Sequence, residues 1–229
     1  MRLILGNPDR IKAIAEDFVN HYETRVSEGS TIMGKAMFVC ASRQIAFSLY
    51  QEIIALRPEW AEVKEADDRI ALTDQERKEI KPNAKIKLIA TRHKDDEKEL
   101  YDLCGTKDDR KEHDRQFKNP KSNFKSAIVF DMWLTGFDVK SLATLYLDKP
   151  MKGHPLMQAI ARVNRVAANK KDGLIIDYNG MLKSLRKALA TYAQGDKGTP
   201  ADPLFDEDQA LAEYAAAIGK VQAHLKTVG

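Results

Sequence analysis

The side chains with the most distinctive chemistry form a short series in the last third of the chain. Gln158, Arg162 and Arg165 are spaced i, i+4 and i+7, so they share one face of a helix. A guanidinium group is permanently charged and binds phosphate oxygens through two parallel hydrogen bonds. Two such groups on one helix suit recognition of the terminal phosphates of a nucleotide. The alternative is an ordinary solvated helix face, the usual setting of paired arginines.

The same segment carries an apolar stripe that would fix the orientation of the helix. The stripe repeats at helical spacing and consists of Leu156, Ile160, Val163 and Ala167. It is two residues out of phase with the polar series, which is about 200° of rotation at about 3.6 residues per turn. We therefore expect the apolar stripe to be buried and the polar series to face away from it.

A second candidate segment, Asp131 to Asp138, directly follows an apolar run of strand length. Ligands of open α/β sheets bind outside the carboxyl ends of the strands, where this segment would lie. Gly136 permits close approach of the backbone, and the Thr135 hydroxyl can donate to a phosphate. Asp138 can accept from a ribose hydroxyl or orient an arginine. The alternative is a turn with a capping Asp.

The segment from Gly29 to Lys35 matches the glycine and lysine spacing of a P-loop. Ala36, however, stands where a Ser or Thr hydroxyl should meet magnesium. The segment also leads into a predicted strand, so its amides would not converge at a helix N-terminus. We interpret it as a polar turn, and we expect the primary phosphate site to be supplied from elsewhere.

The composition excludes several classes of protein. The chain has 229 residues, of which 43% are hydrophobic and 31% charged, enough for a sizeable core and too polar for a membrane span. A net charge of +3 gives no general sign of nucleic-acid binding. Two cysteines, Cys40 and Cys104, fit neither a disulfide framework nor a zinc site. We expect no metal site and a cytoplasmic location.

Short apolar runs predict five strands, at residues 36–40, 86–90, 127–130, 142–147 and 174–178. Helical patterns separate most of them, which favours a parallel sheet covered on both faces. Ser42 is placed as the N-cap of one helix, and Arg57-Pro58 would end it. The charged stretch 62–82 predicts a surface insertion, and 94–121 predicts a long loop with one solvated helix.

The chain divides into three predicted parts. Residues 1–195 would form the α/β domain, and the Gly- and Pro-containing stretch 196–204 a linker. Residues 205–229 carry an Ala-rich helical pattern with no partner element. They predict the start of a following helical region.

These segments together resemble a known family. Thr135-Gly-Phe-Asp138 resembles motif V of superfamily 2 helicases, and Gln158-Ala-Ile-Ala-Arg-Val-Asn-Arg165 resembles their motif VI. Phe38 to Arg43 has the order and context of motif IV. The longer stretches 131–138 and 148–166 resemble the motor subunit, R, of type I restriction enzymes. The likeness covers roughly residues 9–192 and is densest over 128–178.

The resemblance implies the second RecA-like lobe of a double-stranded DNA translocase, a three-layer α/β domain with a mainly parallel sheet. In such motors ATP and Mg²⁺ are held mainly by the first lobe, and the second supplies arginines across the cleft. Carried over, Arg165 is the arginine finger on the γ-phosphate, Arg162 lies beside it, and Gln158 orients both. Gly136 and Asp138 would link the nucleotide to DNA.

The resemblance also implies contacts with the DNA backbone. Ser42, Arg43 and Thr135 would contact the phosphates of one strand. Arg92 lies in Thr91-Arg-His-Lys94, where helicases often have a glycine or a hydroxyl side chain, and is a further candidate. Ala161 replaces the glycine that usually precedes the first arginine of motif VI, a change small enough to keep the packing.

The partners implied are double-stranded DNA, the first RecA-like lobe and nuclease domain of the same subunit, and the specificity and methyltransferase subunits. We expect that this chain alone neither hydrolyses ATP nor cuts DNA. Two other functions stay open. One is a RecA-like nucleic-acid or protein-binding module without an ATPase role. The other is a free-standing hydrolase using the strand-end carboxylates Asp131, Asp138, Asp148 and Asp177.

Overall fold

The structure is a computed structural model of the 229-residue chain. It describes residues 2–29, 34–66, 70–134, 138–152, 154–163, 173–183 and 185. The chain divides into two compact units, Met1–Met181 and Leu182–Gly229. The helices and strands described here all belong to the first unit. The linker predicted at 196–204 and the helix predicted at 205–229 lie outside the described residues, so these boundaries stay predictions.

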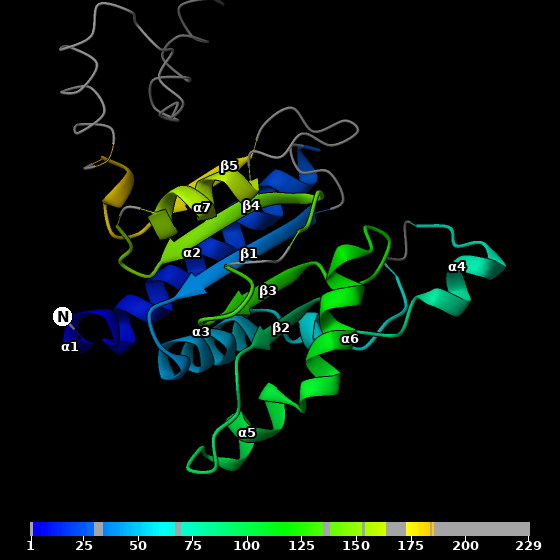
Figure 1. Ribbon diagram of the computed structural model, residues 1–229, viewed down its shortest axis with the longest axis horizontal. Coiled ribbons are helices and arrows are strands. Elements are labelled where there is room, and N and C mark those ends of the chain that lie inside the picture. The colour runs from blue at the N-terminus through cyan, green and yellow to red at the C-terminus, as the bar shows by residue number, and fades with distance from the viewer. Residues whose placement is uncertain are drawn as a thin grey trace, which may run out of the picture. The chain divides into compact units, whose positions relative to one another are not determined.

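Five parallel strands form the central sheet of this unit (Figure 1). They are β1 (Lys35–Cys40), β2 (Ile86–Ile89), β3 (Ser126–Val129), β4 (Leu142–Asp148) and β5 (Leu174–Asp177). Their order is β2-β3-β1-β4-β5, and every neighbouring pair is parallel. Each of the five strands predicted from the sequence is confirmed within one or two residues. Their near-continuous apolar runs arise because both faces of a parallel sheet are buried.

Helices connect and cover these strands. They are α1 (Arg2–Leu5), α2 (Pro8–Ser27), α3 (Arg43–Leu56), η2 (Pro58–Ala61, a 3-10 helix), α4 (Asp74–Glu79), α5 (Lys98–Cys104), α6 (Lys107–Lys118) and α7 (His154–Val163). Asn7 caps α2, since its side chain accepts from the Arg10 amide at 3.2 Å. Ser42 caps α3 in the same way through the Ile45 amide, also at 3.2 Å, as predicted.

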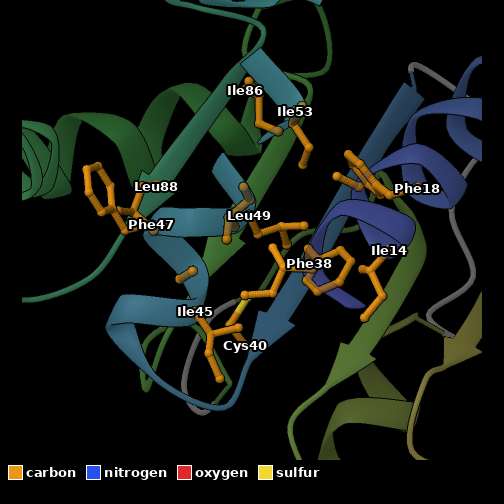
Figure 2. Close-up of a cluster of buried hydrophobic side chains, with 14 of the residues drawn as sticks. Ile14, Phe18, Phe38, Cys40, Ile45, Phe47, Leu49, Ile53, Ile86 and Leu88 are labelled. Atoms are coloured by element: carbon orange, nitrogen blue, oxygen red, sulfur yellow. The ribbon is translucent and has the colours of Figure 1, made fainter. Parts of the chain in front are cut away.

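One face of the sheet is covered by α2 and α3, which also pack on each other. Phe18 of α2 lies edge-on to Phe38 of β1 and to Tyr146 of β4, with ring centroids 5.6 and 4.7 Å apart. Figure 2 shows Phe18 and Ile14 of α2 on one side of Phe38, and the α3 side chains Ile45, Leu49 and Ile53 on the other. These residues form the main apolar core.

The opposite face is covered by α6 and α7. Phe117 of α6 is fully buried and packs against the ring of Phe124, which precedes β3. On α7 the predicted apolar stripe is buried at Leu156, Ile160 and Val163. The predicted three-layer α/β architecture with a parallel central sheet is therefore confirmed.

The charged stretch 94–121 differs from its prediction of one helix in a long loop. It contains two helices, α5 and α6, separated by Gly105 with φ +59°. A capping box starts α6: the Thr106 side chain accepts from the Asp109 amide, and the Asp109 carboxylate accepts from the Thr106 amide. This local signal outweighs the low apolar content that suggested a loop.

The insertion predicted at 62–82 is present and contains the short helix α4, which projects away from the sheet in Figure 1. Two antiparallel bridges, Lys64 with Asn83 and Ala66 with Ser122, attach its ends to the domain. The Lys121 ammonium lies 2.6 Å from Glu76 of α4. The insertion is thus fastened by backbone bridges and surface ion pairs.

Lys35 is an unusual member of the core. It is the first residue of β1, its side chain is 0% exposed, and its ammonium donates to the Phe124 carbonyl 5.1 Å from the centre of the Phe117 ring. Burial, with a smaller contribution from nearby Lys125, holds the pKa of Lys35 well below its ordinary value of 10.5. The native state therefore holds the proton on Lys35 less tightly than the unfolded chain does.

This difference predicts a pH-dependent stability. Between the lowered native pKa and the ordinary value of 10.5 the unfolded state binds more protons than the native state, so the Lys35 contribution to stability rises with pH across this window. We expect the gain in the free energy of unfolding of Lys35→Met over the wild type to be largest at the low-pH end of this window. Its advantage should shrink as the pH approaches 10.5.

Urea unfolding of both proteins at several alkaline pH values measures this. The control is Lys111→Met, which replaces a side chain that is 68% exposed. A stability difference between Lys35→Met and the wild type that does not change with pH would contradict the prediction.

Candidate functional site

The loop after β3 and the helix α7 meet at Arg162. Its Nε donates to the carbonyl oxygen of Leu134 at 2.9 Å. Arg162 and Gln158 are both half-buried, whereas Leu156, Ile160 and Val163 on the other stripe of α7 are buried. Two segments that the sequence singled out separately, 131–138 and 158–165, are therefore in direct contact.

The path of the loop explains this contact. Asp131 pairs with Lys149, the residue after β4, at the carboxyl edge of the sheet. Trp133 is only 8% exposed and stacks on Phe117, with 5.3 Å between ring centroids. Its ring also lies 6.3 Å from that of Phe124, which precedes β3 at the amino edge. The sequence placed the whole loop at the carboxyl edge, but the loop turns along the face of the sheet towards the amino edge.

Several predicted site residues cannot be placed. Thr135, Gly136 and Arg165 lie outside the described residues, so their roles stay predictions. Asp138 is described and exposed. It lies four residues after Leu134, whose carbonyl accepts from Arg162.

Ser42 and Arg43 lie at the start of α3, after the carboxyl end of β1. The Ser42 hydroxyl caps α3. The Arg43 guanidinium forms an ion pair with Asp96, and both side chains are largely buried. A contact from Arg43 to a DNA phosphate would therefore compete with Asp96. Sequence reasoning missed this partner because Asp96 lies in a loop 53 residues further along the chain.

Arg92 lies on the connection that follows β2. Its guanidinium carbon is 4.6 Å from the centre of the Tyr101 ring of α5, a cation–π contact. The side chain is half-buried, and its position on the tyrosine ring fixes it at the surface near β2. The predicted role of Arg92 on DNA is not tested by this geometry.

The strand-end carboxylates have structural partners. The buried Asp148 carboxylate binds the Arg10 guanidinium of α2 through both oxygens, with 3.1 Å between Arg10 Nη1 and Asp148 Oδ2. The Asp177 carboxylate accepts from the Asn179 amide at 2.9 Å. With Asp131 paired to Lys149, three of the four carboxylates bind a basic side chain or a backbone amide. This arrangement does not favour a free-standing hydrolase.

Neither a metal centre nor a membrane segment is found in the described part of the chain. Among those residues, no three or more His, Cys, Asp or Glu side chains gather as a metal ion would require. None of the helices described there has the length and apolar character needed to cross a membrane.

The described residues thus form an α/β domain with a parallel sheet, in which Arg162 of α7 binds the loop that follows β3. Comparison with known families then identifies it. The family model for Type I restriction enzyme subunit R domain 3 matches residues 33–180. The chain belongs to this family.

Two curated relatives carry corresponding names. The Type I restriction enzyme HindI endonuclease subunit of Haemophilus influenzae is 44% identical over 192 residues, covering 82% of this chain and 16% of the relative. The putative type I restriction enzyme MjaIXP endonuclease subunit of Methanocaldococcus jannaschii is 34% identical over 227 residues, covering 98% of this chain and 19% of the relative. The chain therefore spans less than a fifth of either relative.

The Arg10–Asp148 pair gives a stability prediction. Asp148→Asn removes the charge that compensates Arg10, which is only 23% exposed. Breaking a fully buried pair costs about 3–5 kcal/mol, and the partial exposure of Arg10 lowers our expectation to about 2–3 kcal/mol. Chemical denaturation measures the loss. The control is Asp108→Asn, whose carboxylate pairs with Lys111 at the surface and should cost under about 1 kcal/mol. Equal losses in the two variants would contradict the prediction.

Proposed function

We propose that this domain is the second motor lobe of a type I restriction R subunit and acts in ATP-dependent translocation on double-stranded DNA. The contact from Arg162 Nε to the Leu134 carbonyl carries the proposal. It joins the segment that resembles motif VI to the segment that resembles motif V, as a lobe that couples a nucleotide to DNA requires. Membership of the R subunit family supports the same role.

In this proposal Arg162 of α7 and Arg165 act on a nucleotide held mainly by another lobe. Arg165 is the arginine finger on the γ-phosphate, Arg162 stands beside it, and Gln158 orients the cluster. ATP and Mg²⁺ are bound chiefly by a first lobe that carries the P-loop. The burial of Lys35 within β1 supports this division, because its side-chain nitrogen donates to the Phe124 carbonyl inside the fold and is not exposed for a phosphate.

The DNA contacts proposed for the lobe are to the backbone. Ser42, Arg43, Thr135 and Arg92 would bind phosphates, and Gly136 and Asp138 would couple these contacts to the nucleotide. Cleavage belongs to a nuclease domain of the same subunit in this proposal. The specificity and methyltransferase subunits complete the complex, which works in the cytoplasm.

Replacing the proposed arginine finger separates this function from a pure binding module. In an R subunit in which this sequence forms the domain, Arg165→Ala should lower the DNA-stimulated ATPase rate by about 10³-fold or more, as expected for an arginine finger. DNA affinity and its salt dependence should hardly change. Steady-state ATPase assays and DNA binding at several salt concentrations measure both quantities.

The control is Arg115→Ala, an exposed arginine paired with Glu112 on α6, which should leave both quantities unchanged. If Arg165→Ala instead weakens DNA binding and flattens its salt slope while ATPase per bound DNA persists, the domain is a binding module.

The 229-residue chain by itself provides a second test. We expect no DNA-stimulated, magnesium-dependent ATP hydrolysis above background, because finger and phosphate cradle belong to different lobes in this proposal. A phosphate-release assay with purified chain, DNA and Mg²⁺ measures this. Robust turnover that Arg165→Ala abolishes would contradict the two-lobe arrangement.

A further inference from the structure

The loop after β3 contains two side-chain-bearing residues with left-handed backbone. Asp131 has φ +50° and Trp133 has φ +63°. For a bulky residue such as tryptophan this conformation is a rare outlier. Such strain persists only where the surrounding structure holds the backbone firmly, and it often occurs beside functional groups.

Three contacts hold this loop over four consecutive residues. Asp131 pairs with Lys149, the indole of Trp133 stacks on Phe117, and the Leu134 carbonyl accepts from Arg162 at 2.9 Å. Trp133 immediately precedes Leu134, so its indole is the side-chain anchor next in sequence to the carbonyl that accepts from Arg162.

Trp133 is supported by α6, which comes between β2 and β3 in the sequence. This helix lies outside the segments that resemble helicase motifs. Phe117 of α6 is 0% exposed and packs on Phe124, with 4.9 Å between ring centroids. The Phe117 ring cannot shift without disturbing its packing against Phe124. The planes of the Phe117 and Trp133 rings are 29° apart, a stacked arrangement that restricts the tilt of the indole.

We infer that Trp133 is a positioning residue for Arg162: α6, through Phe117, holds the indole, and the indole holds the Leu134 carbonyl where Arg162 Nε–H binds it. The guanidinium is planar, so fixing Nε–H also fixes the plane in which its terminal N–H groups lie. The structural part of this inference stands on the contacts alone. Its consequence for ATP hydrolysis rests on the proposed function.

The first experiment measures the hydrogen bond itself. In the ¹⁵N-labelled 229-residue chain, Trp133→Ala should speed hydrogen exchange at Arg162 Nε–H about fivefold to tenfold, the factor that matches loss of one net hydrogen bond. Trp133→Phe keeps an aromatic ring on Phe117 and should restore most of the protection. Trp60→Ala is the matched control, since it truncates a buried tryptophan among Phe18 and Tyr22 on the other face of the sheet.

Two results would overturn the inference. One is unchanged Arg162 exchange in folded Trp133→Ala, and the other is an equal acceleration in Trp60→Ala, which would mean a general loss of stability. If Trp133→Ala does not fold, Phe117→Leu carries the same test, because it removes the stacking partner and leaves the loop sequence intact. Unchanged exchange in that variant would also overturn the inference.

The second experiment uses the R subunit in which this sequence forms the domain. Trp133→Ala should lower kcat for ATP with little change in KM, and adding it to Arg162→Ala should lower kcat no further, since both act through one group. Additive losses would overturn the inference. Faster Arg162 exchange with unaltered ATPase would keep the positioning role and instead remove Arg162 from the proposed function.

Discussion

A constraint of chain connectivity shapes the candidate site. β3 and β4 are parallel, and β1 lies between them, so the connecting residues 130–141 must cross a strand and return from the carboxyl edge to the amino edge. No helix forms in the described residues of this connection. An irregular segment lying against a sheet must satisfy its own backbone groups and bury its own apolar side chains. Trp133 and Val139 are the buried apolar side chains among the described residues of this connection, and Arg162 satisfies the Leu134 carbonyl.

α7 forms the next connection, between β4 and β5. It begins after the carboxyl end of β4 and packs on β4 and β5 before the chain enters β5. Its apolar stripe fixes the rotation of the helix, so Gln158 and Arg162 are presented away from that stripe. The meeting of Arg162 with the loop thus follows from two parallel connections that share one face of the sheet. A right-handed crossover puts α7 there, as is usual for parallel strands.

The sequence was sufficient for the parts of the fold that depend on local patterns. An apolar run predicts the strand from Lys35 to Cys40, and Ser42 is predicted as a helix cap, because each of these patterns spans only a few residues. The amphipathic phase of α7 likewise predicted which stripe is buried. The family resemblance joined the two site segments, although their spacing in sequence gives no distance between them.

What could not be predicted depends on contacts between distant residues. Arg43 appeared available for DNA, yet Asp96 engages it, and no local pattern relates these positions. The left-handed backbone of Trp133 and its stack on Phe117 are likewise visible only in the structure. From the sequence we interpret Lys35 as the last residue of a polar turn, whereas the structure buries it. Its burial follows from its place as the first residue of a central strand.

Adjacent residues at the end of β4 carry opposite charges and bind different partners. Asp148 binds Arg10 of α2, whereas Lys149 binds Asp131 of the loop after β3. If β4 slid by one residue in one direction, Lys149 would take the place of Asp148 beside Arg10. In the other direction, Asp148 would take the place of Lys149 beside Asp131. Either slip brings two like charges together, so this dipeptide opposes a shift of β4 in both directions, in addition to the residues of the strand, which are all buried.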